Sequence, residues 1–372
     1  MTKRVLRAGL LGAGTIATAS GGFLPGMTRI PELVTTVAIA DPVPGRAAQV
    51  ARDHGIPHAH AGLDEMLERM DLDLVVNLTP IPLHYATSRR ILEAGKHLVL
   101  EKPLAGTLEE ADELIAIAAA QRLRIVVAPP NMLYQNRVEA KRLIAEGAIG
   151  KPCFARVRGS HGGPASGAWP LDPTWFYQQG SGPLLDMGVY GIHDITGLLG
   201  PAKRVTAFSG ITEPRRQVRA GPFAGLEIEV TADDNTLMML DFGGSTFAVV
   251  DGTYNVNAAR SPHVEIFGRA GTLNLYNHHG KPDVPPLELF RLGAAPAEDG
   301  WTTPRQPPVA GDLNDQWQQL QRALLVKHLA ECVIEDRQPV LSAEHARHAL
   351  EIMVKSIESA RTGMAIELRT TF

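Results

Sequence analysis

An alternation of short apolar runs with helical patterns over the first 128 residues is the feature that most restricts the fold. Runs typical of buried strands lie at residues 5–11, 34–41, 74–77, 98–100 and 124–128, and we expect six strands in this part of the chain. Stretches with helical periodicity separate these runs. The order therefore predicts a right-handed, doubly wound parallel sheet, and ligands bind at the carboxyl ends of such strands.

The pattern changes after residue 152, where strand-like runs follow one another without intervening helices. Such runs lie at residues 153–159, 204–211, 236–242 and 245–254, and turn signals such as Phe242-Gly243-Gly244 separate them. Successive strands of this kind predict an open sheet that is mainly antiparallel.

Together the two patterns predict an α/β chain of two domains. We expect a doubly wound Rossmann domain over residues 1–128, then an α+β domain with a large open, mainly antiparallel sheet over residues 129–372. Helices near residues 314–336 and 342–362 should close the chain, and the proline-rich stretch at residues 277–311 predicts a surface excursion. A length of 372 residues favours this division, because one hydrophobic core rarely extends over so long a chain.

Composition excludes several classes of protein. A hydrophobic content of 44% and a formal net charge of −4 are typical of a soluble globular protein, and no basic block indicates nucleic acid. No apolar run has the length of a membrane span, and glycines interrupt the stretch that resembles a signal peptide. The two cysteines, Cys153 and Cys332, have no metal-ligand or redox spacing, which favours a reducing, cytoplasmic location. His345 and His348 lack a third ligand, so we expect no metal site and place both at the surface.

The first predicted strand leads into a glycine-rich turn, Gly12-Ala13-Gly14-Thr15-Ile16-Ala17. In the order strand, turn and helix, Gly-x-Gly-x-x-Ala is a fingerprint of dinucleotide binding. Gly12 allows the tight turn, Gly14 lets a pyrophosphate approach the backbone, and Ala17 allows the helix to pack closely on the strand. The turn therefore predicts a dinucleotide cofactor.

The second predicted strand ends in Asp41, and an acid at this place accepts the ribose hydroxyls of NAD. The same carboxylate repels the 2′-phosphate of NADP, so the sequence favours NAD. Arg46 could bind that phosphate, which leaves NADP open as the less favoured cofactor. Surplus residues around positions 20–25 predict a loop insertion near the cofactor.

The strand at residues 98–100 ends abruptly in Glu101-Lys102-Pro103. Proline restricts the backbone, so the lysine ammonium should be held at a fixed place beside the ligand crevice. For this tripeptide alone, a solvated Glu-Lys pair on a loop is the alternative.

One predicted helix, at residues 184–199, interrupts the strands of the second domain, and Gly180-Ser181-Gly182-Pro183 leads into it. Asp186, Tyr190 and His193 are spaced i, i+4 and i+7, which places them on one face of the helix. The alternative is an amphipathic helix with a solvated polar face.

Two glycines, Gly188 and Gly191, lie inside the same predicted helix. Each costs about 1 kcal/mol relative to alanine there. Glycines at this cost indicate that another part of the structure approaches the helix backbone closely.

These motifs resemble the Gfo/Idh/MocA family of oxidoreductases, which includes glucose–fructose oxidoreductase and inositol dehydrogenases. The resemblance spans residues 5–212 and implies a nicotinamide cofactor in the first domain. It also implies an open sheet in the second domain whose free face commonly builds a dimer, so we expect a homodimer or homotetramer. The matching motifs are the glycine turn, Asn77-Leu78-Thr79-Pro80, Ala94-Gly95-Lys96-His97, Glu101-Lys102-Pro103 and the segment from Gly180 to Gly188.

The resemblance further implies roles for individual residues. Lys102 would touch nicotinamide and substrate, and Asp186 would hold the reacting sugar. Many family members carry a catalytic histidine four residues after this aspartate, whereas this chain has Tyr190 there and His193 one turn later. The candidate residues are Lys102, Asp186, Tyr190 and His193 for catalysis; Gly12, Gly14, Thr15, Ile16, Asp41, Arg46, Asn77, Thr79, Pro80, His84, Glu101 and Lys102 for the cofactor; and Lys102, Asn131, Trp175, Tyr177, Asp186 and His193 for the substrate.

Oxidation of a secondary alcohol requires hydride transfer to nicotinamide and removal of the hydroxyl proton. A tyrosine with an ordinary pKa of about 10 is a poor base at neutral pH, but a nearby ammonium such as that of Lys102 lowers the pKa of a phenol. Histidine titrates near neutral pH, so His193 is the alternative to Tyr190 as proton carrier, or a relay.

We therefore expect an NAD-dependent oxidoreductase that oxidises a secondary alcohol of a sugar, inositol or sugar acid, or reduces the corresponding ketone. Tyr190 and Lys102 would form its proton-transfer site. One alternative is a glycosidase or lyase that retains NAD and acts through transient oxidation of the sugar. Another is a non-catalytic NAD-binding regulator, although the presence of Lys102, Asp186 and Tyr190 together argues against it.

Overall fold

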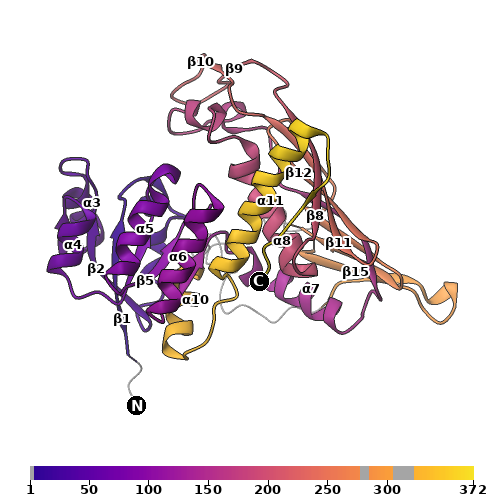
Figure 1. Ribbon diagram of the computed structural model, residues 1–372, viewed down its shortest axis with the longest axis horizontal. Helices are drawn as coiled ribbons and strands as arrows, with labels where there is room; N and C mark the ends of the chain where they lie inside the picture. The colour runs from indigo at the N-terminus through magenta and orange to yellow at the C-terminus, as the bar shows by residue number, and fades with distance from the viewer. Residues whose placement is uncertain (1–3, 277–284, 305–321) are drawn as a thin grey trace. The chain divides into compact units, whose positions relative to one another are not determined.

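The structure is a computed structural model that describes residues 4–276, 285–304 and 322–372 (Figure 1). The chain divides into two compact units, one made of Met1–Leu133 with Pro308–Leu350 and the other of Tyr134–Pro307 with Glu351–Phe372. Parts of the predicted excursion at 277–311 and of the predicted helix at 314–336 lie outside the described residues. No helix in the described ranges is long and apolar enough to cross a membrane.

Six strands of the described residues form the parallel sheet of the first unit, in the order β3-β2-β1-β4-β5-β6. This doubly wound arrangement confirms the predicted Rossmann sheet. The sequence located five of the strands but missed β3, because its three residues include two histidines and show no apolar pattern. The strands are β1 (Leu6–Leu11), β2 (Val34–Ala40), β3 (His58–His60), β4 (Leu74–Asn77), β5 (His97–Leu100) and β6 (Ile125–Val127).

Helices of the first unit connect these strands (Figure 1). Of the surplus residues, positions 20–22 form a turn, as expected, and a short helix, α2, begins at Phe23, where Phe23, Leu24 and Met27 are all buried. The helices are α1 (Thr15–Thr18), α2 (Phe23–Met27), α3 (Arg46–His54), α4 (Leu63–Arg69), η1 (Ile81–Leu83), α5 (His84–Glu93), α6 (Leu108–Ala120), η2 (Asn131–Leu133) and α10 (Ala323–Ile334).

Helix α10 packs on β5 and β6, although it lies about 200 residues after them in the chain. Leu325, Val326 and Leu329 are completely buried by this contact and its surroundings. The compact units therefore differ from the expected division at residue 128, since hydrophobic burial returns the chain to the first unit after β16 (Gly300–Thr302), before the last strand of the second sheet, β17 (Ile366–Glu367), is formed.

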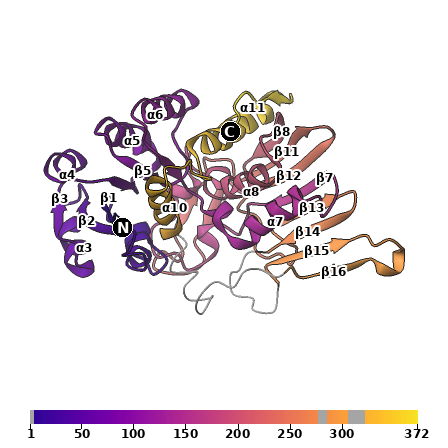
Figure 2. The same cartoon turned by 90° about the horizontal axis from the view of Figure 1, so that it is seen from below.

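Nine strands of the described residues form the sheet of the second unit, in the order β16-β15-β14-β13-β7-β12-β11-β8-β17 (Figure 2). Among these strands only β7 and β12 pair in parallel, which confirms a large, mainly antiparallel sheet. The described part of the predicted excursion contains β15 and β16, so it extends the sheet. The strands are β7 (Pro152–Arg158), β8 (Arg204–Gly210), β11 (Asn235–Gly243), β12 (Thr246–Thr253), β13 (Val264–Gly268), β14 (Gly271–Leu275), β15 (Leu287–Arg291), β16 (Gly300–Thr302) and β17 (Ile366–Glu367), and β9 (Arg215–Gln217) pairs with β10 (Glu227–Glu229) separately.

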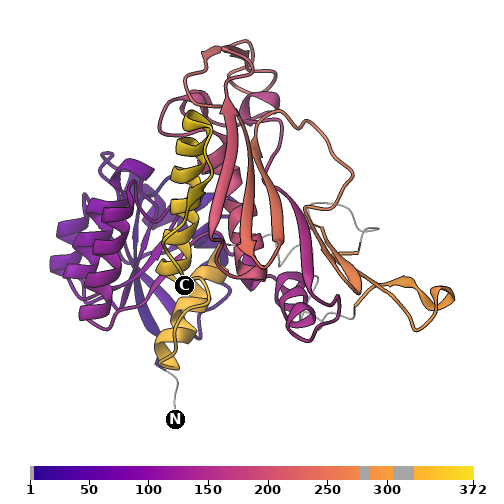
Figure 3. The ribbon, with the colours of Figure 1, turned by 45° about the vertical axis from the view of Figure 1, so that its right-hand side comes forward.

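Helices cover one face of this sheet. Helix α8 packs on β7, β12 and β13, and the second half of α11 lies along β8 and β11, where Ser359 accepts a hydrogen bond from the backbone of Ala207 at 3.0 Å (Figure 3). His345 and His348, earlier in α11, are buried, so their expected surface placement is wrong. The helices are α7 (Gln135–Ala145), η3 (Pro164–Ser166), η4 (Thr174–Tyr177), the π-helix η5 (Leu184–Gly188), α8 (Val189–Leu199), η6 (Pro296–Glu298) and α11 (Ala343–Thr362).

The opposite face of the sheet carries exposed apolar side chains. Phe208 on β8 is 85% exposed, and its neighbour across the strand pair, Leu237 on β11, is 49% exposed. Met239 and Phe247 are exposed to a similar extent as Leu237. We call these four residues the open face.

Candidate cofactor and substrate sites

The glycine turn after β1 has the geometry that its sequence predicts. Gly12 has φ of +102°, and a Cβ atom there would lie 2.9 Å from the carbonyl oxygen of Leu78, so only glycine fits. A Cβ atom at Gly14, in contrast, would have no neighbouring atom of the described residues within 4 Å. Gly14, Thr15 and Ile16 are exposed, so the turn presents its backbone on an open side.

Asp41 is fixed beside this turn at the end of β2. Its carboxylate accepts hydrogen bonds from the backbone N–H groups of Ala13 and Val43, both at 2.9 Å, and it is buried. The guanidinium of Arg46 lies 3.5 Å from the same carboxylate. The turn therefore carries an acceptor suited to ribose hydroxyls, with the half-exposed Arg46 paired to it.

Asn77 uses its side-chain amide to shape the loop after β4. The amide nitrogen donates to Thr87 at 2.8 Å and to Ser88 at 3.1 Å, and the amide oxygen accepts from the hydroxyl of Thr79 at 2.8 Å and from its backbone N–H at 3.2 Å. These four bonds match the full capacity of an amide. Asn77 therefore positions Thr79 and Pro80 rather than presenting its own side chain.

His84 connects the loops that follow β4 and β5. Its ring nitrogens lie 2.7 Å from the carbonyl oxygen of Pro103 and 2.9 Å from that of Thr79, and the side chain is buried. Burial lowers the pKa of His84, and the two carbonyl oxygens oppose that effect. The ring ties the Glu101-Lys102-Pro103 segment to the loop that Asn77 shapes.

Arg322, just before α10, is a residue of this region that the sequence did not indicate. Its guanidinium donates to the carbonyl oxygen of Gly21 at 2.9 Å and lies 3.6 Å from the carboxylate of Glu101. Glu101 and Lys102 are partly exposed at the carboxyl end of β5, and the Lys102–Pro103 peptide is cis. No local pattern relates Arg322 to a motif more than 200 residues earlier, so only the fold brings them together.

In the second unit, Asp186 lies in the π-helical turn at the start of the predicted helix and accepts a hydrogen bond from the hydroxyl of Tyr254 at 2.9 Å. Tyr254 is 1% exposed, whereas Asp186 is partly exposed. Burial, and then the nearby carboxylate, raise the pKa of Tyr254, so its hydroxyl stays a donor at neutral pH. The sequence placed Tyr254 at the end of a strand but gave it no role.

Close packing against the sheet explains the glycines of this helix. A Cβ atom at Gly191 would lie 3.1 Å from Val157 and 3.2 Å from Val250, and one at Gly188 would lie 3.4 Å from the backbone of Gly252. The expected close approach is confirmed, and the approaching elements are β7 and β12. The Gly188–Gly252 contact holds the π-helical turn against the end of β12, two residues before Tyr254.

Tyr190 and His193 differ in their access to solvent. Tyr190, in the first turn of α8, is partly exposed, whereas His193, one turn later, is 2% exposed. The predicted single face is therefore split by burial, because α8 lies with much of its surface on the sheet. π-Helical turns of the kind that carries Asp186 occur frequently at functional sites.

Three more residues expected to contact the substrate, Tyr177, Trp175 and Asn131, lie in different surroundings. Tyr177 is buried in an apolar cluster with Tyr254, their ring centroids are 5.3 Å apart, and its hydroxyl accepts a hydrogen bond from Ala165 at 3.0 Å. Trp175, two residues earlier in η4, is 42% exposed. Asn131 is buried in η2 of the first unit. Tyr177 thus supports the ring of Tyr254.

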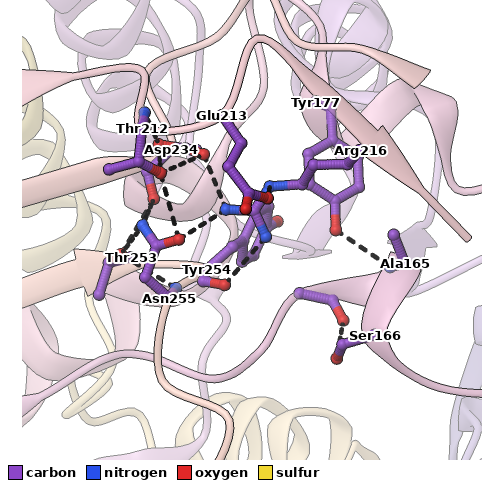
Figure 4. Close-up of polar contacts among 11 residues, drawn as sticks. Ala165, Ser166, Tyr177, Thr212, Glu213, Arg216, Asp234, Thr253, Tyr254 and Asn255 are labelled. Carbon is purple, nitrogen blue, oxygen red and sulfur yellow. Dashed lines mark hydrogen bonds and ion pairs between the residues drawn. The ribbon is translucent and has the colours of Figure 1, made fainter. Parts of the chain in front are cut away.

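A polar network holds the strand end that carries Tyr254 (Figure 4). Arg216 donates to the carbonyl oxygen of Tyr254 at 3.2 Å, to Asp234 at 2.8 Å and to Asn255 at 2.6 Å. Burial raises the pKa of Asp234, but hydrogen bonds from Thr212 and Arg216 outweigh it and leave this pKa below its ordinary value. Asp234 therefore accepts these hydrogen bonds as an ionised carboxylate at neutral pH.

Metal-ligating side chains do not gather in the described parts of either unit, where no group of three or more His, Cys, Asp or Glu residues has a metal-binding arrangement.

Comparisons with known proteins agree with this geometry. Residues 6–128 match the model of an oxidoreductase family with an NAD-binding Rossmann fold, Gfo/Idh/MocA, and residues 138–274 match the C-terminal domain of the same family. A D-xylose dehydrogenase of Paenarthrobacter nicotinovorans is 26% identical over 347 residues, which cover 84% of this chain and 82% of the relative.

Solved structures show the same fold over nearly the whole chain. An NAD-binding oxidoreductase from Klebsiella pneumoniae superposes with a TM-score of 0.84 at 23% identity, covering 99% of this chain and 100% of that one. A levoglucosan dehydrogenase in complex with NADH and levoglucosan gives a TM-score of 0.82 at 23% identity with the same coverage. With its glycine turn, its two sheets and the family models matched on both, this chain belongs to the Gfo/Idh/MocA family of oxidoreductases with an NAD-binding Rossmann fold.

Proposed function

We propose that this protein is an NAD-dependent dehydrogenase that oxidises a secondary alcohol of a sugar, an inositol or a sugar acid. The observation that carries the proposal is the Asp186–Tyr254 hydrogen bond, which holds a partly exposed carboxylate in a fixed orientation. A carboxylate accepts several hydrogen bonds, so Asp186 suits the hydroxyl groups of a polyol.

The geometry of the first unit supports NAD as the cofactor. The open side of the turn at Gly14 leaves room for a pyrophosphate, and Asp41 is an acceptor for ribose hydroxyls. Thr15 and Ile16 would line the phosphates, and Thr79, Pro80 and Glu101 the rest of the dinucleotide. A dinucleotide held by these residues would supply the hydride acceptor for the alcohol carbon.

The protein's own residues must then manage the proton. As the carbon loses its hydride and the carbonyl bond forms, the hydroxyl proton passes to a base. We assign this role to Tyr190, with Lys102 stabilising its phenolate, and Asp186 orienting the substrate. The partial exposure of Tyr190 supports this choice over the buried His193, which would act as a relay.

Turnover of a sugar panel tests the function. Purified protein with NAD is offered polyols, aldoses, inositols and sugar acids, and nicotinamide absorbance is followed. Net NADH formation from one class supports the dehydrogenase. Release of a leaving group from a glycoside without net NADH would replace it with the NAD-retaining glycosidase, and binding of NAD with no turnover of any kind would favour a regulator.

We also propose that the protein is a homodimer or homotetramer assembled through the open face. Phe208, Leu237, Met239 and Phe247 form an exposed apolar surface on one sheet, and surfaces of this kind mark interaction sites. A cytoplasmic location is supported by Cys153 and Cys332, which are free thiols within the described residues.

A further inference from the structure

A cavity of about 320 Å³ lies in the second unit and is lined by parts of residues 162–166, 213–219 and 254–257. Its volume falls at the lower end of the roughly 300–1,000 Å³ typical of small-molecule sites. The buried ring of Tyr254 and the side chain of Arg216, which is only 10% exposed, form its floor. Asp186, which accepts the hydroxyl of Tyr254, is not among the described residues that line the cavity, so the cavity is separate from the proposed substrate site.

Hydrogen bonds within the protein fix one part of the wall (Figure 4). The amide nitrogen of Asn255 donates to the carbonyl oxygen of Asp234 at 3.3 Å and to the hydroxyl of Thr253 at 2.9 Å. Its amide oxygen accepts from Arg216 at 2.6 Å and from Thr212 at 3.2 Å. These four bonds match the full capacity of the amide, so Asn255 shapes the cavity and a ligand must bind to other groups.

One cation of the lining has no counter-ion in the described part of the chain. Arg219 is exposed, and its guanidinium forms no ion pair with a described carboxylate. Arg216, in contrast, lies 2.8 Å from Asp234 and 3.7 Å from Glu213. A ligand carboxylate can form the bidentate pair that a guanidinium favours with Arg219, whereas Glu213, which also lines the cavity, repels a dianion more strongly.

The other polar groups of the lining mostly accept hydrogen bonds. The hydroxyl of Ser166 donates to the carbonyl oxygen of Gly163 at 2.7 Å, which leaves its oxygen as an acceptor. The amide nitrogen of Gln217 donates to the carbonyl oxygen of Gly225 at 3.4 Å, which leaves the amide oxygen. The amide of Asn257 forms no hydrogen bond with the described residues and offers both functions. The lining therefore suits a ligand with several hydroxyl groups.

Gly162 keeps the cavity open. A Cβ atom at this position would lie 2.6 Å from the hydroxyl of Ser166 and 2.7 Å from the side-chain oxygen of Asn257. Gly162 does not have a positive φ, so space for these polar groups, rather than backbone conformation, requires glycine.

We propose that this cavity binds a small hydroxylated monocarboxylate, such as an aldonate, as a second ligand of the protein. The carboxylate of the ligand pairs with Arg219. Its hydroxyl groups donate to the oxygens of Ser166, Gln217 and Asn257. This binding does not depend on oxidation of a sugar, so the inference goes beyond the proposed function.

Calorimetry of D-gluconate binding to the NADH-loaded protein tests this site. D-Glucitol has a hydroxyl in place of the carboxylate, and acetate has a carboxylate without hydroxyl groups. Gluconate should bind at least about tenfold more tightly than either, because only gluconate satisfies both kinds of lining group. Arg219→Ala should weaken gluconate binding about 10-fold or more and Asn257→Ala roughly 3- to 10-fold, the effects expected for losing charged and neutral hydrogen bonds. Arg215→Ala, on an exposed residue of β9 outside the lining, is the control and should keep the affinity.

Asp186→Asn separates this cavity from the substrate site. The variant should keep its affinity for gluconate, whether or not the protein oxidises any sugar. Gluconate binding that Asp186→Asn abolishes and Arg219→Ala leaves intact overturns the proposal, because the ligand would then occupy the substrate site. Glucitol that binds as tightly as gluconate, or no binding of gluconate at millimolar concentrations, also overturns it. Tighter binding of glucose 6-phosphate than of gluconate would replace the monocarboxylate with a dianion and overturn the proposed ligand class.

Discussion

The hydroxyl of Tyr254 donates a hydrogen bond to the carboxylate of Asp186, and 68 residues of chain separate the two. Three features place them together: the contact between Gly188 and Gly252, the π-helical turn that carries Asp186, and the Arg216 network that holds the carbonyl of Tyr254. A buried phenol thus fixes a partly exposed carboxylate, which is the arrangement needed to orient a hydroxylated substrate.

Removal of the Tyr254 hydroxyl should weaken substrate use without unfolding the protein. A hydrogen bond to a charged group contributes about 1.5–3 kcal/mol, so Tyr254→Phe should lower kcat/KM roughly 10- to 100-fold, mainly through a higher KM. Tyr276→Phe is a matched control, because the hydroxyl of Tyr276 donates to Glu288 at 3.0 Å in the same unit. Equal kinetics in the two variants would show that the Tyr254–Asp186 bond has no part in substrate binding.

Substitutions at Tyr190 and at His193 should show which of the two residues carries the proton. Tyr190→Phe should lower kcat roughly 10²- to 10⁴-fold with little change in substrate affinity, since general acid–base catalysis is lost. Lys102→Ala should be at least as damaging, and Asp186→Asn should mainly weaken binding. If Tyr190→Phe turns over normally with the parental pH profile while His193→Asn shows the large loss, His193 is the proton carrier.

The preference for NAD should depend on Asp41. We expect at least a tenfold preference over NADP, because placing a carboxylate against a 2′-phosphate costs more than about 1.4 kcal/mol. Asp41→Ser should narrow the preference and still accept the hydrogen bond of Ala13. Asp64→Ser, on a surface residue paired with Arg90, is the control. The measurement is kcat/KM with NAD and with NADP for each variant. Equal values for the two cofactors in the parent protein would contradict the prediction.

Assembly should depend on the open face. Phe208→Glu introduces a charge at its most exposed apolar position, so the variant should become monomeric at micromolar concentration while its circular dichroism stays unchanged. Leu292→Glu alters an exposed apolar residue elsewhere in the unit and should leave assembly intact. Light scattering measures the outcome. A parent protein that is already a clean monomer would refute assembly through this face.

Stability should fall in mild acid because of His328. Burial lowers the pKa of His328 to about 4, and its Nε2 accepts a hydrogen bond from the backbone of Val340 at 2.9 Å, which requires the neutral ring. Between about pH 6.5 and 4 the unfolded chain binds the proton and the native state does not, so stability is lost as pH falls through this window, by at most roughly 3 kcal/mol.

The chemical denaturation midpoint between pH 7 and pH 4 measures this loss. His328→Gln keeps an acceptor for Val340 but cannot titrate, so it should flatten the profile. An unchanged slope would mean that other groups control the acid sensitivity. His54, a partly exposed histidine at the end of α3, provides the control substitution His54→Gln.

The sequence predicted what local patterns encode. The glycine turn, Asp41 at the end of β2, and the helix beginning near Asp186 all follow from short stretches whose spacing has a direct structural meaning. Gly188 and Gly191 correctly indicated that another element approaches the helix backbone closely, although nothing in the sequence identified β12 as that element.

Contacts between segments that are far apart in the sequence could not be predicted from it. Tyr254 reads as an ordinary aromatic residue of a strand, and Arg322 as an arginine before a helix, because neither lies within a motif. Tyr177 was expected near the substrate, but its aromatic type describes burial equally well, and it packs beneath Tyr254. Strand β3 was missed because pairing with β2 outweighs its polar composition.

The return of α10 to the first unit has a consequence for synthesis of the protein. The sheet of β1 to β6 leaves the ribosome early, but the helix whose Leu325, Val326 and Leu329 pack on the first unit is made only near the end of the chain. At a synthesis rate of about 5–20 residues per second, the apolar surface that α10 later covers stays exposed for roughly 10–40 s. Chaperones can therefore bind this apolar surface of the first unit before synthesis of the chain is complete.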